Sequence, residues 1–245
     1  MYVMWQRQMK RFLRSKSRII GSLAQPLLFL LSFGFGFGAV FSKAGEGNYI
    51  EFLGPGIVGM SILFTAMFSG MEVIWDRQFG FLKETLVAPV SRITIMIGRV
   101  LGSATVATLQ GCIVLAITLV AGFHPYSWAL VPVAILVMAL IATLFTALGT
   151  IVGSTLRDMQ GFQFIMGFLV MPLFFLSGAL FPLSGIPPVM ELIARFDPLS
   201  YGIDLMRWVL IGTAHFSVAL DLGVLVTVTV IFLAVGSYFF SKIEA

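Results

Sequence analysis

The sequence predicts an all-α integral membrane protein with six transmembrane helices, and three observations support this fold class. Of the 245 residues, 59% are hydrophobic and only 11% are charged, whereas soluble domains carry roughly 25% charged residues. Several runs without charge reach the roughly 20 residues that a helix needs to cross a bilayer. Basic residues gather at the ends of alternate runs, which is typical of the cytoplasmic side of membrane proteins.

An amphipathic helix is expected over residues 1–18, lying on the inner membrane surface. Trp5, Met9, Phe12 and Leu13 recur at helical spacing, and the opposite face is rich in Lys and Arg. The same charges would also set the topology of the chain without such a helix, so both interpretations stay open. Binding of nucleic acid is not expected, because the basic segment leads directly into a membrane span.

Six membrane spans account for the apolar runs. The run over 100–156 is too long for one crossing and is divided at HPYSW (124–128), where Pro125, Tyr126 and Trp128 predict a turn at the membrane surface. The stretch 208–220 is too short to cross, which favours an interfacial or re-entrant segment. The predicted spans are 19–42, 52–71, 96–122, 129–153, 162–181 and 222–241.

The region between the fifth and sixth spans, residues 182–221, is expected on the outer side, where it dips partly into the membrane. Several prolines interrupt it, and proline disfavours a continuous helix. Two short re-entrant helices therefore fit better than one long helix. The prolines are Pro182, Pro187, Pro188 and Pro198.

The positive-inside rule orients the chain with both termini in the cytoplasm. Twelve basic residues fall on one predicted side of the membrane and three on the other. The first group comprises Arg7, Lys10, Arg11, Arg14, Lys16, Arg18, Arg77, Lys83, Arg92, Arg99, Arg157 and Lys242; the second comprises Lys43, Arg195 and Arg207. No cleavable signal peptide is expected, because the first apolar run is long enough to span and lacks a small-residue cleavage site.

Runs of small residues predict close packing between helices. GRVLG (98–102) and GTIVG (149–153) place glycines four residues apart, and SFGFGFG (32–38) alternates Phe with Gly. A flexible gate at the last of these is the other interpretation. No internal repeat or soluble domain is evident, so residues 1–245 are expected to form one transmembrane domain.

Side chains for catalysis or metal binding are not gathered in any motif. His124 and His215 are far apart in the sequence, and the single cysteine, Cys112, lies in an apolar run. No carboxylate falls at the middle of a predicted span, which argues against an ion-coupled carrier. No GxxxxGK[ST] loop occurs, so neither ATP binding nor enzymatic activity is expected of this chain. Energy for transport would have to come from another protein.

The loop over residues 76–92 is unusually charged for this chain. It holds Asp76, Arg77, Lys83, Glu84 and Arg92, and its apolar positions recur every three or four residues. This pattern predicts a short amphipathic helix on the cytoplasmic side, ending before Pro89. A solvated loop would not need an apolar stripe, so the helix is expected to lie on the membrane or in a groove of a partner. The stripe consists of Phe79, Leu82, Leu86 and Val90.

Two segments resemble the ABC type-2 permease family, of the drug-resistance type. FLKETLVAPVSRITIMIGRVLGS matches closely over 81–102, and SGALFPLSGIPPVMELIARFDPLSYGIDLMR, at 177–207, is similar to the external segment of the family. Asp197 stands where the family often has Asn. The span count and spacing agree with the family along essentially the whole chain.

The resemblance implies that the chain is one half of a permease and that two copies form the membrane pathway. Two separate ABC ATPase subunits, which bind ATP and Mg²⁺, would bind beneath them. Residues 77–89 correspond to the family's coupling helix, and Glu84 stands at its acidic position. The residues expected to couple to the ATPase are Arg77, Phe79, Leu82, Lys83, Glu84, Leu86, Pro89 and Arg92. The expected external re-entrant residues are Pro182, Pro187, Pro188, Asp197, Pro198, Tyr201 and Arg207.

The expected function is outward transport of a hydrophobic or amphiphilic molecule, drug-like or lipid-like, across the cytoplasmic membrane. The 24 Phe and 13 Met residues favour such cargo, because soft apolar surfaces tolerate variety. Export of a polysaccharide or lipid-linked glycan is the alternative, followed by an ion-coupled carrier. Polar residues within spans are the candidate pathway residues: Gln25, Thr65, Gln110 and Gln163.

Overall fold

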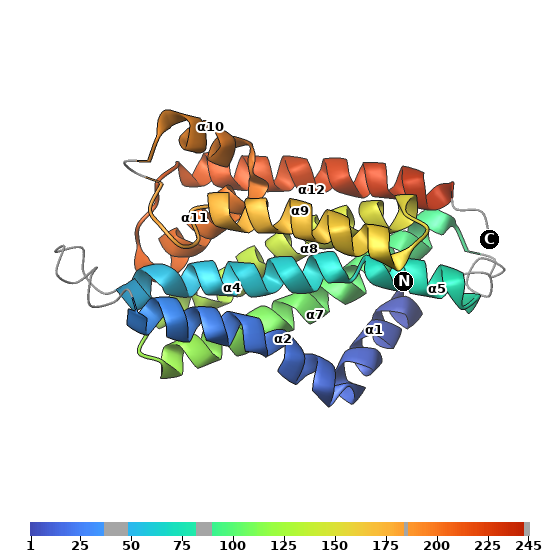
Figure 1. Ribbon diagram of the computed structural model, residues 1–245, viewed down its shortest axis with the longest axis horizontal. Coiled ribbons are helices and arrows are strands. Elements are labelled where there is room, and N and C mark those ends of the chain that lie inside the picture. The colour runs from blue at the N-terminus through green and yellow to red at the C-terminus, as the bar shows by residue number, and fades with distance from the viewer. Residues whose placement is uncertain (37–48, 82–89, 184–185, 243–245) are drawn as a thin grey trace.

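A computed structural model describes residues 1–36, 49–81, 90–183 and 186–242, which form a bundle of long helices lying side by side (Figure 1). These residues contain no β-strand. Five helices are long and apolar enough to cross a membrane, and a bent N-terminal pair passes the same test as a sixth unit. The prediction of an all-α membrane protein is therefore confirmed, with five spans or six.

The helices follow the predicted spans closely, apart from residues 37–42 of the first span, which lie outside the described residues. The chain runs through α1 (Tyr2–Arg14), α2 (Lys16–Phe29), a π-helical turn η1 (Leu30–Phe35), α4 (Tyr49–Phe68), α5 (Met71–Gln78), α7 (Arg92–Val120), a 3₁₀ turn η2 (Trp128–Leu130), α8 (Val131–Thr155), α9 (Met159–Leu176), α10 (Pro188–Phe196), α11 (Pro198–Ile211) and α12 (Val218–Ser241).

Two predicted boundaries were wrong. The fifth span ends at Leu176 and not at residue 181, because the chain turns at Gly178, whose φ of 75° suits glycine. The second span does not give way to a loop at Asp76. After a turn at Ser69 and Gly70 the chain continues as α5 to Gln78, so the apolar unit extends over Tyr49–Gln78.

Polar residues begin four of the helices. The side chains of Ser91, Asp158, Asp197 and Ser217 accept hydrogen bonds from N–H groups in the first turns of α7, α9, α11 and α12. Such N-caps satisfy N–H groups that have no partner within the helix. Pro188 and Pro198 open α10 and α11, where proline is tolerated, so the prolines do divide this region into two short helices.

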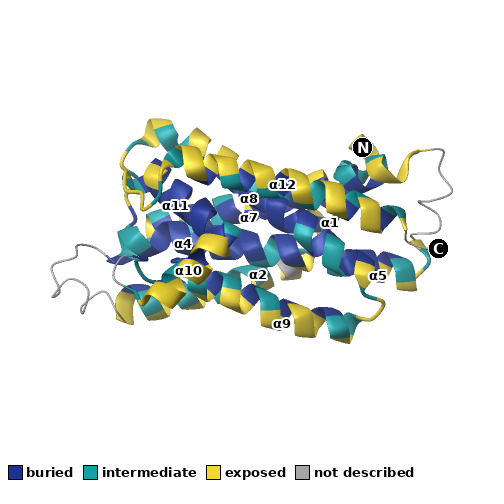
Figure 2. Ribbon diagram, turned by 90° about the horizontal axis from the view of Figure 1, so that it is seen from above, coloured by how far each residue is buried: buried dark blue, intermediate teal, exposed yellow. Residues whose placement is uncertain are grey.

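Helix α4 lies at the centre of the bundle, packed against α7, α8 and α11, while α9, α10 and α12 carry more exposed surface (Figure 2). Leu53, Ile57, Met60, Leu63 and Met67 of α4 are completely buried. Both α1 and α5 lie at one end of the bundle, and α10 and α11 lie at the other (Figure 1). Helix α12 ends on the α5 side, so the two ends of the described chain lie at the same end of the bundle.

Glycines allow the α4–α5 turn to touch α8 backbone to backbone. A Cβ built on Gly70 would lie 2.0 Å from the carbonyl oxygen of Gly149, and one on Gly153 would lie 2.2 Å from that of Gly70. The GTIVG motif therefore packs as predicted. In GRVLG, Gly98 and Gly102 of α7 receive α1, since their Cβ positions lie 2.9 Å from Met1 and 3.0 Å from Gln8.

The glycine contact predicts opposite effects for two Gly→Ala substitutions. Gly153→Ala forces α8 away from the α4–α5 turn and destabilises the fold by about 1–3 kcal/mol or more, as overpacking does. Gly223→Ala in α12 meets nothing within 4 Å and gains up to about 1 kcal/mol of helix propensity. Thermal unfolding in one detergent should rank Gly223→Ala at or above the unsubstituted chain and Gly153→Ala well below it. Equal unfolding temperatures would contradict the contact.

Candidate functional site

Helix α1 is held along α7 at the end of the bundle where α5 lies. Trp5 donates from Nε1 to the hydroxyl of Thr105 at 3.1 Å, and the side chains of Gln8 and Phe12 are buried. An amphipathic N-terminal helix is therefore present. Its buried face packs on protein, whereas Tyr2, Leu13 and the basic side chains Lys10 and Arg14 are exposed.

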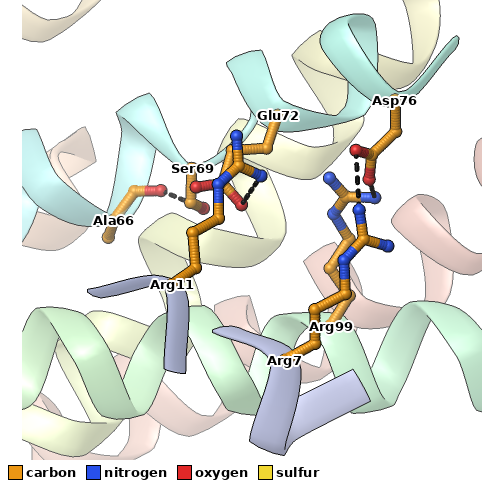
Figure 3. Close-up of polar contacts among 7 residues, drawn as sticks. All are labelled: Arg7, Arg11, Ala66, Ser69, Glu72, Asp76 and Arg99. Carbon is orange, nitrogen blue, oxygen red and sulfur yellow. Dashed lines mark hydrogen bonds and ion pairs between the residues drawn. The ribbon is translucent and has the colours of Figure 1, made fainter. Parts of the chain in front are cut away.

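Three arginines pair with two buried carboxylates where α1, α5 and α7 meet (Figure 3). Asp76 lies between Arg7 of α1, at 3.1 Å, and Arg99 of α7, at 2.9 Å. One turn earlier on α5, Glu72 lies 3.7 Å from Arg11. The side chains of Asp76, Glu72 and Arg99 are almost fully buried, whereas those of Arg7 and Arg11 keep about a third of their surface exposed.

These charges were expected in a cytoplasmic loop or near its edge, and the structure corrects that expectation. Arg99 lies in the third turn of α7, and Glu72 and Asp76 lie within the helical unit Tyr49–Gln78. The sequence does contain a signal for the pairing. Arg7 and Arg11 are four residues apart, as are Glu72 and Asp76, so each pair occupies one helix face.

Other residues at this end tie α5 and α7 to the C-terminal ends of neighbouring helices. Arg77 donates from Nη1 to the carbonyl of Leu156 and from Nη2 to that of Ser154, both at 3.0 Å. Arg92 donates to the carbonyl of Ser241 at 2.6 Å. Cations at such positions satisfy carbonyls that the last turn leaves unpaired.

The predicted coupling residues are only partly described. Arg77 and Arg92 contact this chain itself, and Phe79 is exposed just beyond α5. Leu82, Lys83, Glu84, Leu86 and Pro89 lie outside the described residues. What the structure brings together is therefore the base of the predicted coupling segment, anchored on both sides.

A cavity of about 580 Å³ opens between α1, α2, α4 and α5, within the range of roughly 300–1,000 Å³ typical of small-molecule sites. Gln25 of α2 and Thr65 of α4 line it, as do Met60 and Phe64 deeper in the bundle. Arg11, Glu72 and Trp75 line its α5 end.

The other two candidate pathway residues lie elsewhere. Gln110 of α7 is fully buried, and neither atom of its amide has a hydrogen-bond partner among the described residues. Gln163 of α9 is exposed on the outside of the bundle. Of the four residues chosen for their polarity within a span, two line the cavity and two lie away from it.

The opposite end holds the predicted external residues. Arg207 donates from Nη2 to the carbonyl of Gly178 at 2.6 Å, and its guanidinium lies 3.8 Å from the centre of the Phe52 ring. Tyr201 donates from its hydroxyl to the carbonyl of Arg195 at 2.7 Å. Of the prolines, Pro187 and Pro188 begin α10, Pro198 begins α11, and Pro182 is half-buried before α10.

Buried carboxylates also occur at this end. Asp204 of α11 accepts hydrogen bonds from the backbone N–H groups of His215 and Phe216, which fixes the turn into α12. Asp197 caps α11, accepting from the N–H of Leu199 at 2.8 Å. Burial raises the pKa of the Asp197 carboxyl to about 8, against the lowering effect of that hydrogen bond.

Comparison with known proteins identifies the family. The family model for the ABC-2 type transporter matches residues 1–211. The chain belongs to this family. It is 30% identical to nodulation protein J of Rhizobium leguminosarum bv. trifolii over 226 residues, which cover 91% of this chain and 83% of the relative.

Two further relatives extend the comparison to other organisms. Nodulation protein J of Bradyrhizobium diazoefficiens is 31% identical over 212 residues, covering 84% of this chain and 79% of the relative. The ycf38 protein of Cyanophora paradoxa, named as a transport permease, is 28% identical over 262 residues, covering 99% of this chain and 88% of the relative. The predicted family is therefore confirmed, and the chain is a multi-pass transport permease.

Among the described residues, no group of three or more His, Cys, Asp or Glu side chains is placed to hold a metal ion. The charged groups at the α5 end are instead paired across helices. In this ABC-2 permease these ion pairs have a structural role, because they fix α5 to α1 and α7.

The buried ion pair predicts a ranking of stability. Asp76→Ala leaves Arg99 buried without its carboxylate and destabilises the fold by about 3–5 kcal/mol. Arg7→Gln removes a partly exposed partner and costs about 0–1 kcal/mol. The double variant Asp76→Ala/Arg99→Met should recover much of the loss. Thermal unfolding in detergent checks this order; an Asp76→Ala chain as stable as Arg7→Gln would refute it.

The raised pKa of Asp197 predicts a pH dependence. Because the pKa of Asp197 in the folded chain, about 8, lies above its ordinary value of 3.8, the folded state binds the extra proton. The stability that protonation of Asp197 gives the folded chain is therefore complete below about pH 4 and is lost as pH rises toward 8. Asp197→Asn keeps a capping oxygen without this titration, so it should match the parent near pH 4 and exceed it at pH 8. If the unfolding temperatures of the two chains changed with pH in the same way, the raised pKa of Asp197 would be disproved.

Proposed function

We propose that this chain is the permease subunit of an ATP-driven exporter, in which two copies form the membrane pathway and two ABC ATPase subunits bind ATP and Mg²⁺. One observation carries the proposal: α5 is anchored by buried ion pairs to α1 and α7 and continues into the central helix α4. A force applied at the end of α5 would therefore move the whole α4–α5 unit and not bend the end of α5 alone.

The proposed lever is the coupling helix at 77–89, with Glu84 and the stripe of Leu82 and Leu86 seated in a groove of the ATPase. Closure of the two ATPases upon ATP binding displaces this helix. The displacement reaches α4 through α5 and reaches α7 through Arg92 and the start of that helix. Tilting of these two spans alternates access to the pathway.

The proposed orientation puts the α1 and α5 end, with the termini, in the cytoplasm. All the described basic residues of the predicted cytoplasmic set belong to this end of the bundle or to the first turns leading from it, whereas Arg195 and Arg207 belong to the opposite end. Helices α10 and α11 then lie at the outer surface, where we propose that they enter the membrane partway and cap the exit.

The proposed cargo is amphiphilic, with a drug-like or lipid-like apolar part. The cavity between α2 and α4 supports this class, because Met60, Phe64 and Phe68 line one part and Arg11 and Glu72 line the other. A polar head would lie at the charged end and an apolar body deeper in the bundle. A lipid-linked glycan has the same division into polar and apolar parts and is the second candidate.

A second copy of the chain is proposed to cover α9. This helix exposes Phe164, Phe168, Met171 and Phe175 at intervals of three or four residues, which forms one apolar face. A pathway between two copies would place this face near the axis of the dimer.

The proposal is tested by reconstituting the chain with its ABC ATPase in vesicles and measuring ATP hydrolysis together with flux of a fluorescent amphiphile. A hydrogen bond to a charged group contributes about 1.5–3 kcal/mol, so Glu84→Ala should lower the flux per ATP hydrolysed roughly tenfold or more. Glu191→Ala, which removes a carboxylate at the opposite end, is the matched control and should leave coupling unchanged.

The same assay tests the cavity. Thr65→Trp fills the space between α2 and α4 and should abolish stimulation of hydrolysis by the amphiphile, while basal hydrolysis persists. Full flux in the absence of the ATPase would contradict the ABC mechanism. Normal coupling in Glu84→Ala would remove only the role of that residue, and normal stimulation in Thr65→Trp would remove only the cavity.

A further inference from the structure

A basic groove lies at the bend between α1 and α2. It adjoins the cavity described above, and Arg11 and Ser15 line both. The two helices meet at Ser15, whose φ of −100° and ψ of 78° are not helical, and their axes differ by 72°. The groove has a volume of about 960 Å³, and the described residues that line it all lie within 3–17. Five of its lining residues are cationic: Arg7, Lys10, Arg11, Arg14 and Lys16.

The charge of this groove is not balanced within the described chain. Arg7 and Arg11 pair with Asp76 and Glu72 on α5, but Lys10, Arg14 and Lys16 are exposed. Among the described residues no acidic side chain lines the groove, and the first carboxylate of the sequence is Glu46. The first turn of α2 adds N–H groups, because no side chain caps it, and such groups favour an anion.

An apolar stripe begins at the groove and runs along the outside of α2 and η1. Four residues after Lys16 comes Ile20, with 69% of its surface exposed, and the same face continues with Leu28, at 61%, and Phe35, at 63%. Ser22 and Gln25, on the other face of α2, line the cavity instead. The stripe therefore faces away from the cavity and toward the surroundings of the bundle.

A ligand that fits both features has a phosphate at one end and a long hydrocarbon chain at the other. A free phosphate would use the cations but not the stripe, and a neutral lipid would use the stripe but not the cations. Clusters of basic residues beside a transmembrane helix attract anionic lipids, with roughly 1 kcal/mol for each Lys or Arg near the surface.

We propose that this groove binds the phosphate of an anionic phospholipid of the inner leaflet, whose acyl chain lies along the α2 stripe. The lipid joins α1 to α2 across their bend, since Lys10 and Arg14 come from one helix and Lys16 from the other. It is a resident ligand and not cargo. The proposal rests on the orientation given under the proposed function, but it is independent of the nature of the cargo and of the ATPase.

Native mass spectrometry of the full chain in detergent tests the site, with phosphatidylglycerol and phosphatidylcholine as probes. Arg14→Gln/Lys16→Gln should weaken phosphatidylglycerol binding roughly 30-fold, because two basic residues contribute about 2 kcal/mol and 1.4 kcal/mol is tenfold. Arg157→Gln/Lys242→Gln removes the same charge from exposed positions nearby and should change binding less than threefold, as the matched control. Arg14→Lys/Lys16→Arg should retain binding.

Several outcomes would overturn the proposal. Equal losses in the groove and control variants would mean that net charge alone attracts the lipid. Equal affinity of the unsubstituted chain for the two lipids would remove the role of the cations. Displacement by glycerol phosphate as effective as by the intact lipid would assign the groove to a soluble phosphate. Full binding after Ile20→Ser/Leu28→Ser would exclude the stripe. Unchanged thermal unfolding of each variant without added lipid verifies that the fold is intact.

Discussion

The buried ion pairs at one end of the bundle determine how the helices of this permease are fixed to one another. A buried arginine needs a partner that compensates its charge, and for Arg99 of α7 that partner is Asp76 of α5. Asp76 in turn accepts Arg7 of α1. Three helices that are distant in sequence are thereby fixed to one another where the chain connects its second and third membrane spans.

Close contact between backbones extends this anchoring into the membrane. The α4–α5 turn touches α8 at Gly149 and Gly153, and Arg77 of α5 binds the carbonyls at the end of α8. Because α4 is also the most buried span, the ion pairs, the glycine contact and the hydrophobic core belong to one continuous body. The cavity lies at the edge of that body, between α4 and the less enclosed α2.

Composition and charge predicted the spans and their order, since these depend on the thickness of a bilayer. The family was predicted from the resemblance of residues 81–102 and 177–207 to the ABC type-2 permeases. Neither composition nor local sequence predicts which side chains pair when they are distant in the chain. Asp76 and Arg77 were assigned to a loop because a charge usually ends a span, a rule that does not hold where partners from other helices bury the charge. Likewise, Gln25 and Gln163 look alike in sequence, but only packing decides that one lines the cavity and the other lies outside.

The absence of side chains between Gly70 and Gly149 has a consequence for movement. Helices separated by side chains can slide as rotamers change, whereas two backbones in direct contact have no such intermediate layer. The α4–α5 unit and α8 must then travel together as a block. Relative motion during a transport cycle is left to the boundary with α2 and α9, where a bend, a π-helical turn and a thinly packed span replace that contact.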